Sequence, residues 1–194
     1  MIDINKLFNL YYGWWKNIDK FILFLILFLF SLGLFFSLVS TSIIASDKLN
    51  TNTYYFFIKH LLFFILGLFI LITFSAIDKE RLFQISKYLF IIFFIFLALV
   101  PFIGIEVKGS MRWIDLPLIP RFQPIEILKP FLIIMISTIF TLNNQRHLYF
   151  KYLFSFLIIF PVILFLISQP DLGQTILVVL TWFSLIFVSG INLL

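Results

Sequence analysis

Carboxylates, amines and amides must carry any chemistry in this chain, because it has no cysteine and only two histidines. Thiol nucleophiles, disulfides and cysteine-ligated zinc are excluded, and two histidines provide little for a histidine-based metal site. Two polar segments interrupt an otherwise apolar sequence. The first runs from Glu106 to Lys129, and the second is a short stretch from Gln169 to Thr175.

The first polar segment predicts a pair of opposite charges at the start of a helix. Pro124 suits a first helical turn, since its missing N–H would be unpaired there in any case. Glu126 and Lys129 then lie one turn apart, on the same face as Gln123. Such a pair can neutralise itself near a membrane interface. Alternatively, Glu126 is a helix-start carboxylate stabilised by the helix dipole, and Lys129 extends outward to water.

Arg112 and Trp113 also allow two interpretations. Tryptophan beside arginine is a common anchor at a membrane interface. An arginine on the outer face of a membrane can equally bind a phosphate through two hydrogen bonds. The residue types alone leave both roles open.

Asp171 dominates the second polar segment and is likewise open to two interpretations. It can cap the last helix, with Gln174 three residues later in an arrangement like a capping box. It can also face an aqueous groove together with Glu126 and Lys129. Position in the sequence does not choose between the two.

The elements that must position these residues are membrane helices. The chain is 62% hydrophobic and 12% charged, which excludes an ordinary water-soluble domain. Stretches with the alternating pattern of a membrane β-barrel are absent. We predict an all-α, polytopic membrane protein with six transmembrane helices in one domain over residues 1–194. The six uncharged stretches are Phe21 to Ser46, His60 to Ile77, Tyr88 to Ile105, Pro130 to Gln145, Tyr152 to Pro170 and Leu172 to Leu194.

Lysine and arginine set the predicted orientation. Four basic residues of the first polar segment are candidates for chemistry: Lys108, Arg112, Arg121 and Lys129. When these four residues are left out of the count, most of the remaining lysines and arginines lie on the same side of the membrane as the N-terminus. This predicts a cytoplasmic N-terminus. Residues 1–20 are then a cytoplasmic or interfacial segment, anchored by its tyrosines and tryptophans, and residues 106–126 form a loop on the outer face.

Several function classes are excluded by pattern. The net charge of +5 is scattered between apolar runs and forms no basic stripe, so nucleic acid is not a predicted partner. No phosphate-binding or dinucleotide-binding glycine motif occurs, and no cofactor is evident. A divalent metal could bind carboxylates here, but no ligand spacing indicates a metal site.

Three separated motifs resemble those of the SEDS family, whose members include FtsW, RodA and SpoVE. The resemblance covers essentially the whole chain and is closest to FtsW, the division member. It rests on the order and spacing of Gly109-Ser110-Met111-Arg112-Trp113-Ile114, of Phe122-Gln123-Pro124-Ile125-Glu126 with Lys129, and of Gln169-Pro170-Asp171-Leu172-Gly173.

The resemblance implies a peptidoglycan glycosyltransferase that polymerises the lipid-linked disaccharide-pentapeptide, lipid II, during septal wall synthesis. It implies a bacterial inner membrane location at the division septum, with a class B penicillin-binding transpeptidase and other divisome proteins as partners. Family members have about ten spans, so this chain resembles their N-terminal portion, and their catalytic aspartate is expected beyond Leu194. The predicted substrate-binding residues are Arg112, Trp113, Gln123, Glu126, Lys129, Gln169 and Asp171.

Alternative functions remain open at this point. One is a RodA-like polymerase that acts in elongation and cell shape. Another is a lipid II flippase or transporter, which would use a polar groove between helices for the same pyrophosphate lipid. A third is a structural divisome subunit that recruits the transpeptidase. Glycan polymerisation needs a base for the acceptor hydroxyl and positive charge for the leaving pyrophosphate, and Arg112 is the predicted pyrophosphate contact.

Overall fold

The computed structural model describes residues 12–41, 54–107, 109–117, 119–141 and 148–190. The chain divides into two compact units, Met1–Asp78 and Lys79–Leu194. The prediction of a single helical domain over residues 1–194 stays a prediction.

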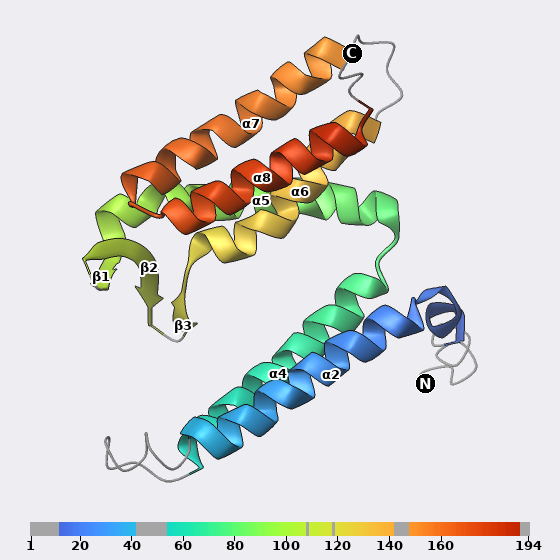
Figure 1. The fold of residues 1–194 in the computed structure, drawn as a ribbon, viewed down its shortest axis with the longest axis vertical. Helices are drawn as coiled ribbons and strands as arrows, with labels where there is room; N and C mark the ends of the chain where they lie inside the picture. The colour runs from blue at the N-terminus through green and yellow to red at the C-terminus, as the bar shows by residue number, and fades with distance from the viewer. Residues whose placement is uncertain (1–11, 42–53, 108, 118, 142–147, 191–194) are drawn as a thin grey trace, which may run out of the picture. The chain divides into compact units, whose positions relative to one another are not determined.

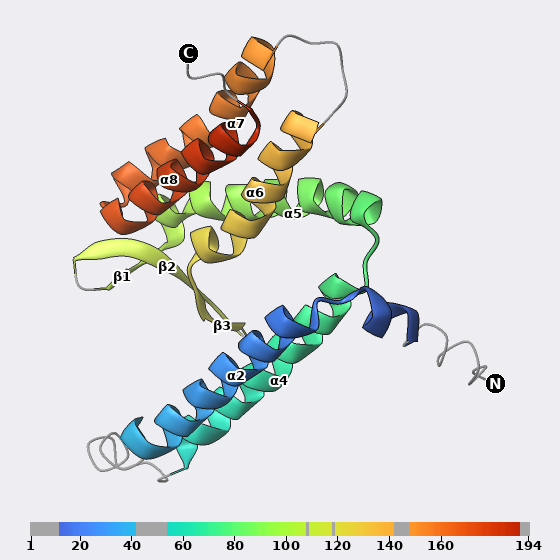
Figure 2. The same cartoon turned by 45° about the vertical axis from the view of Figure 1, so that its right-hand side comes forward.

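The first unit is a pair of apolar helices that lie side by side (Figures 1 and 2), α2 (Lys20–Phe36) and α4 (Tyr55–Ser75), with a short π-helix (Ser37–Thr41) after α2. Asp19 caps α2, because its carboxylate accepts hydrogen bonds from the backbone N–H groups of the first turn. The indole of Trp14 donates to Ser75 Oγ at 2.9 Å, which ties the segment before α2 to the end of α4. Residues 1–11 of the predicted interfacial segment lie outside the described residues.

The second unit contains four helices and the polar segments. They are α5 (Lys79–Ile103), α6 (Pro124–Thr141), α7 (Leu148–Ser168) and α8 (Leu172–Val188). Helix α6 packs against the other three, so the buried core lies along its inner face. That core consists of the following apolar residues: Leu97, Ile125, Leu128, Leu132, Ile136, Ile159, Val162, Leu166 and Val178.

The predicted polytopic helical architecture is confirmed. Among the described residues, five helices are long and apolar enough to cross a membrane: Lys20–Val39, Phe57–Ser75, Lys79–Ile103, Pro124–Thr141 and Tyr149–Ser168. The sixth apolar helix, α8, has 17 residues. Its length is set by Asp171, which caps its start, and by Gly190, which follows its end with φ +92°. Many large apolar side chains of these helices are exposed, as lipid-facing surfaces require.

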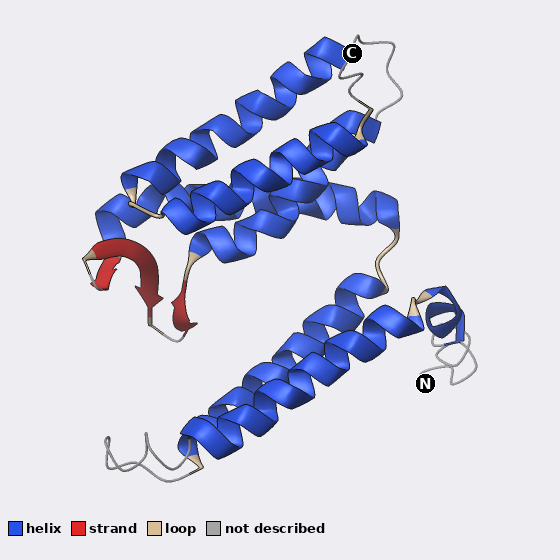
Figure 3. Cartoon of the chain, viewed as in Figure 1, coloured by secondary structure: helices blue, strands red, loops and turns tan. Residues whose placement is uncertain are grey.

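The predicted outer-face loop contains a small antiparallel sheet, drawn in red in Figure 3. Its strands are β1 (Ile105–Val107), β2 (Ser110–Leu116) and β3 (Ile119–Phe122), in the order β1-β2-β3. Val107 pairs with Ser110, and Gly109 in the turn between them has φ +82°, a conformation that glycine adopts readily. Ile114 of β2 is buried, whereas its neighbours Trp113 and Asp115 are exposed. This alternation is what holds one face of β2 against the helices.

Candidate functional site

The turn between α7 and α8 is the centre of the polar site. Two backbone bonds close the end of α7: the N–H of Gln169 donates to Phe165 O at 3.1 Å, and that of Asp171 donates to Leu166 O at 3.0 Å. Asp171 then caps α8, since its carboxylate accepts from the backbone N–H of Gln174. Asp171 is only 4% exposed, so its charge needs partners.

Arg112 supplies the first partner from strand β2. Its Nη1 lies 3.5 Å from Asp171 Oδ1, which forms an ion pair. Its other donors bind the backbone of the turn: Nη2 donates to Pro170 O at 2.6 Å and Nε donates to Gln169 O at 3.4 Å. One guanidinium therefore holds three consecutive residues of the turn, as its rigid fork of donors allows.

Gln123 supplies the second partner from the residue before α6. Its side-chain Nε2 donates to Asp171 Oδ2 at 2.8 Å. The two oxygens of Asp171 thus accept hydrogen bonds from a backbone N–H and an amide, and one of them is ion-paired with a guanidinium. These hydrogen bonds compensate the buried carboxylate and join the start of α6 to the start of α8.

Glu126, Lys129 and Gln174 form a second group of contacts next to the first. Lys129 Nζ lies 2.8 Å from Glu126 Oε2, so the predicted contact between these charges is present. Gln174 binds both of them: its Oε1 accepts from Lys129 at 2.9 Å, and its Nε2 donates to Glu126 at 2.5 Å. The Lys129 side chain is 17% exposed and that of Glu126 is 50% exposed, so the group faces outward through its carboxylate.

We call the residues Arg112, Gln123, Glu126, Lys129, Gln169, Asp171 and Gln174 the polar network. It contains six of the seven predicted site residues. The seventh, Trp113, is 37% exposed on β2 and pairs with Ile105 in the sheet. Gln174 was not among the predicted site residues, although its position one turn after Asp171 could have indicated it.

The structure confirms the cap at Asp171, whereas its place in an aqueous groove stays a prediction. It caps α8, and it belongs to the same network as Glu126 and Lys129, because Gln174 joins the two groups. In a capping box, the side chain of Gln174 would accept a hydrogen bond from the backbone N–H of Asp171. In this protein that N–H donates to Leu166 O instead, and the side chain of Gln174 donates to Glu126 of α6.

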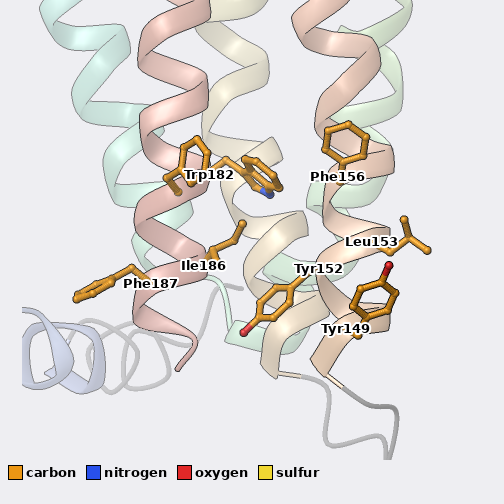
Figure 4. A pocket seen from close by; sticks show the side chains of 8 residues that line it. Tyr149, Tyr152, Leu153, Phe156, Trp182, Ile186 and Phe187 are labelled. Carbon is orange, nitrogen blue, oxygen red and sulfur yellow. The ribbon is translucent and has the colours of Figure 1, made fainter. Parts of the chain in front are cut away.

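A large apolar pocket lies away from the polar network. It has a volume of about 590 Å³ and is formed by the start of α7 and the end of α8 (Figure 4). The turn that carries the polar network joins the end of α7 to the start of α8, so it lies at the opposite ends of these two helices. None of the pocket's lining residues is a predicted site residue; they are Tyr149, Tyr152, Leu153, Phe156, Trp182, Phe183, Ile186 and Phe187. Beside Lys129 there is a cavity of only about 20 Å³ with mostly apolar walls.

No group of three or more histidine, cysteine, aspartate or glutamate side chains in the described part of the chain could hold a metal ion. Within the polar network, cations and amides outnumber carboxylates. Each of these cations and amides is hydrogen-bonded or ion-paired within the protein.

Comparison with models of protein families shows which family this chain belongs to. A family model described as "Cell cycle protein", which covers FtsW, RodA and SpoVE, matches residues 20–194. The chain belongs to the FtsW/RodA/SpoVE family. The SEDS resemblance seen in the three sequence motifs is therefore confirmed.

Individual relatives agree with membership of the FtsW/RodA/SpoVE family. The chain is 36% identical over 99 residues to a probable peptidoglycan glycosyltransferase FtsW from Pasteurella multocida, a match that covers 48% of this chain and 24% of that protein. Its fold matches the rod shape-determining protein RodA of Thermus thermophilus with a TM-score of 0.73 and 24% identity, over 91% of this chain and 55% of that one.

A second solved structure is described as showing structural coordination of polymerization and crosslinking by a peptidoglycan synthase complex. It matches with a TM-score of 0.69 and 25% identity, over 86% of this chain and 47% of that chain. The chain thus spans about half the length of its solved FtsW/RodA/SpoVE neighbours and about a quarter of its curated relative.

Proposed function

We propose that this chain forms part of a peptidoglycan glycosyltransferase that polymerises lipid II during septal wall synthesis. The observation that carries the proposal is the polar network, in which residues of all three family motifs meet at one end of the second unit. The FtsW relative is named for the same activity. In this proposal the protein lies in the bacterial inner membrane at the septum, with a cytoplasmic N-terminus.

The network's role in this function is to position the basic side chains that bind the lipid-linked substrate. A polymerase must stabilise the pyrophosphate that leaves with the lipid, which requires positive charge at the membrane interface. Arg112 and Lys129 provide that charge from β2 and α6. Both are already hydrogen-bonded to the network, so their positions are fixed before substrate binds, which reduces reorganisation during the reaction.

A transpeptidase that crosslinks the new glycan is the proposed protein partner. The solved complex that this chain resembles couples polymerisation to crosslinking. A class B penicillin-binding protein of the division machinery fits that description for an FtsW-like polymerase.

The decisive experiment uses a hybrid protein, because the chain covers about a quarter of its curated relative. Residues 79–190 would replace the matching segment of the Pasteurella multocida FtsW, and the purified hybrid would be reconstituted in vesicles that contain lipid II. Glycan chains would be measured by gel electrophoresis, and transbilayer movement of a fluorescent lipid II would be measured in the same vesicles.

Glycan synthesis by the hybrid that is lost in a folded Arg112→Ala hybrid supports the proposal. Lipid II movement without glycan synthesis would instead identify a transporter. A folded hybrid that does neither, but still recruits the transpeptidase, would identify a structural subunit. The hybrid would also be expressed in cells that lack their own polymerase. A polymerising hybrid that restores rod shape to these cells but not septation would indicate the RodA-like role.

A further inference from the structure

Helix α5 has a backbone carbonyl that its own hydrogen-bond ladder does not satisfy. Pro101 lies inside α5, and proline has no N–H to donate to the carbonyl four residues earlier, which is that of Leu97. Leu97 is completely buried, so water does not reach this carbonyl. A buried carbonyl without a donor is destabilising, and another group must therefore supply the hydrogen bond.

Gln169 supplies it from the end of α7. Its side-chain Nε2 donates to Leu97 O at 3.2 Å, across 72 positions of sequence, and Gln169 itself is only 3% exposed. The side-chain Oε1 of Gln169 is buried and has no hydrogen-bond partner. The donor end of this amide is thus what the site uses, and a carboxylate of the same shape would not replace it.

The backbone of Gln169 belongs to the turn that Arg112 binds. Its carbonyl accepts from Arg112 Nε, and the neighbouring Pro170 carbonyl accepts from Arg112 Nη2. The turn is therefore held from two directions, by α5 through the side chain of Gln169 and by β2 through Arg112. Asp171 and the start of α8 follow directly and carry the rest of the polar network.

We propose that Pro101 and Gln169 act as a pair that positions the α7–α8 turn. Pro101 exposes the Leu97 carbonyl as an acceptor, and Gln169 uses it to fix the turn that presents Asp171 and Gln174. Gln169 is in this view a positioning residue that acts through the turn and does not contact the lipid-linked substrate. The structural part of the proposal stands alone, and its importance for catalysis rests on the proposed function.

The test is a double-mutant cycle on the whole chain in detergent. Gln169→Leu removes the donor, so the Leu97 carbonyl loses its partner, and the thermal unfolding midpoint should fall by roughly 5 °C. Pro101→Ala restores an N–H at residue 101 that can serve Leu97 within α5. In the Pro101→Ala background, the same Gln169→Leu change should therefore lower the midpoint by less than half as much.

Pro161→Ala is the matched control, because Pro161 also lies inside a helix, α7, and Gln169 does not bind the carbonyl it exposes. This change gives the same general gain of helix propensity as Pro101→Ala. It should leave the effect of Gln169→Leu unchanged. Equal effects of Gln169→Leu in the wild-type and Pro101→Ala backgrounds, or equal relief by Pro161→Ala, would overturn the proposal.

A second readout follows the turn itself. The chain has no cysteine, so spin labels can be placed at Met111 on β2 and Leu172 at the start of α8, both of which are exposed. The distance distribution between the labels should broaden in Gln169→Leu and stay broad when Pro101→Ala is added, because the N–H of residue 101 satisfies the Leu97 carbonyl but does not hold the turn. An unchanged distribution in Gln169→Leu would contradict the positioning role.

Two further provisions keep the outcome interpretable. If Gln169→Leu does not fold, the combined Pro101→Ala and Gln169→Leu protein should fold, and its failure to do so would count against the pair. Both readouts are made without lipid II. They can therefore fail while the hybrid still polymerises glycan, or succeed while it does not, which separates this proposal from the proposed function.

Discussion

Arg112 Nη2 donates a 2.6 Å hydrogen bond to the carbonyl of Pro170, which joins strand β2 to the α7–α8 turn across 58 positions of sequence. The predicted pyrophosphate contact is thus also a structural clamp. Its ion pair with Asp171 at 3.5 Å leaves its charge only partly compensated, because the distance is longer than that of a close bidentate pair. Both roles can therefore be separated by mutation.

Arg112→Ala should destabilise the second unit by about 1–3 kcal/mol, because two carbonyls lose a charged donor and a buried carboxylate loses its ion-pair partner. Arg112→Lys should recover only part of this, since one ammonium cannot reproduce the fork of donors. Thermal unfolding in detergent measures both. Arg121→Ala is the control: Arg121 pairs with Asp115 while 63% exposed, so its loss should change stability by about 0–1 kcal/mol. Equal effects of Arg112→Ala and Arg121→Ala would contradict the clamp.

Exchange of the charges of Glu126 and Lys129 should be tolerated better than either single reversal. Each single reversal places two like charges one turn apart, whereas the exchange restores an opposite pair. The Gln174 amide can turn over to offer its donor and acceptor to the exchanged partners. The unfolding midpoints and the glycan yield of the hybrid measure the outcome. If the folded exchange variant has an unfolding midpoint and glycan yield as low as those of the worse single reversal, then it matters which position holds the carboxylate, and not only that the two charges cancel.

Gln174→Glu should be more damaging than Gln174→Leu. The carboxylate would lie against Glu126 in place of a donated hydrogen bond, and like charges repel there. Leucine removes both hydrogen bonds but leaves the contact between Glu126 and Lys129 intact. We expect a loss of about 1 kcal/mol for leucine and a larger loss for glutamate at neutral pH, measured by thermal unfolding. The reverse order would mean that packing, and not charge, determines this position.

Gly104→Ala should destabilise the end of α5. A Cβ at residue 104 would collide with the carbonyl oxygen of Val100 and approach Val100 Cγ1 to 3.1 Å. Backbone must shift to relieve this contact, and we expect a loss of about 1–3 kcal/mol. Gly173→Ala is the control in the same unit, since its Cβ would meet only an ordinary contact at 4.0 Å and alanine favours the helix. A Gly104→Ala protein as stable as Gly173→Ala would rule out this close approach.

Much of the fold follows from the sequence because its causes are local. Long uncharged apolar stretches without the alternation of a β-barrel form helices in a membrane, so the helices are predictable from composition and length. The pairing of Glu126 with Lys129 and the cap at Asp171 are equally local, since each depends on spacing within one helical turn. The strands of residues 105–122 were not predicted, because short strands are stabilised by their pairing and by one buried residue, Ile114.

What the sequence alone determined, then, is the set of membrane helices, the family and the residues capable of chemistry. The tertiary structure decided which of these residues meet. Gln123 reaches Asp171, Gln174 reaches Glu126 and Gln169 reaches Leu97, each across more than forty positions. Such contacts depend on how helices pack, and packing arises from the summed contacts of many buried side chains that no local pattern encodes. The pleat of β2 likewise decided that Trp113 lies on the exposed face of the strand, while its role as a substrate-binding residue stays a prediction.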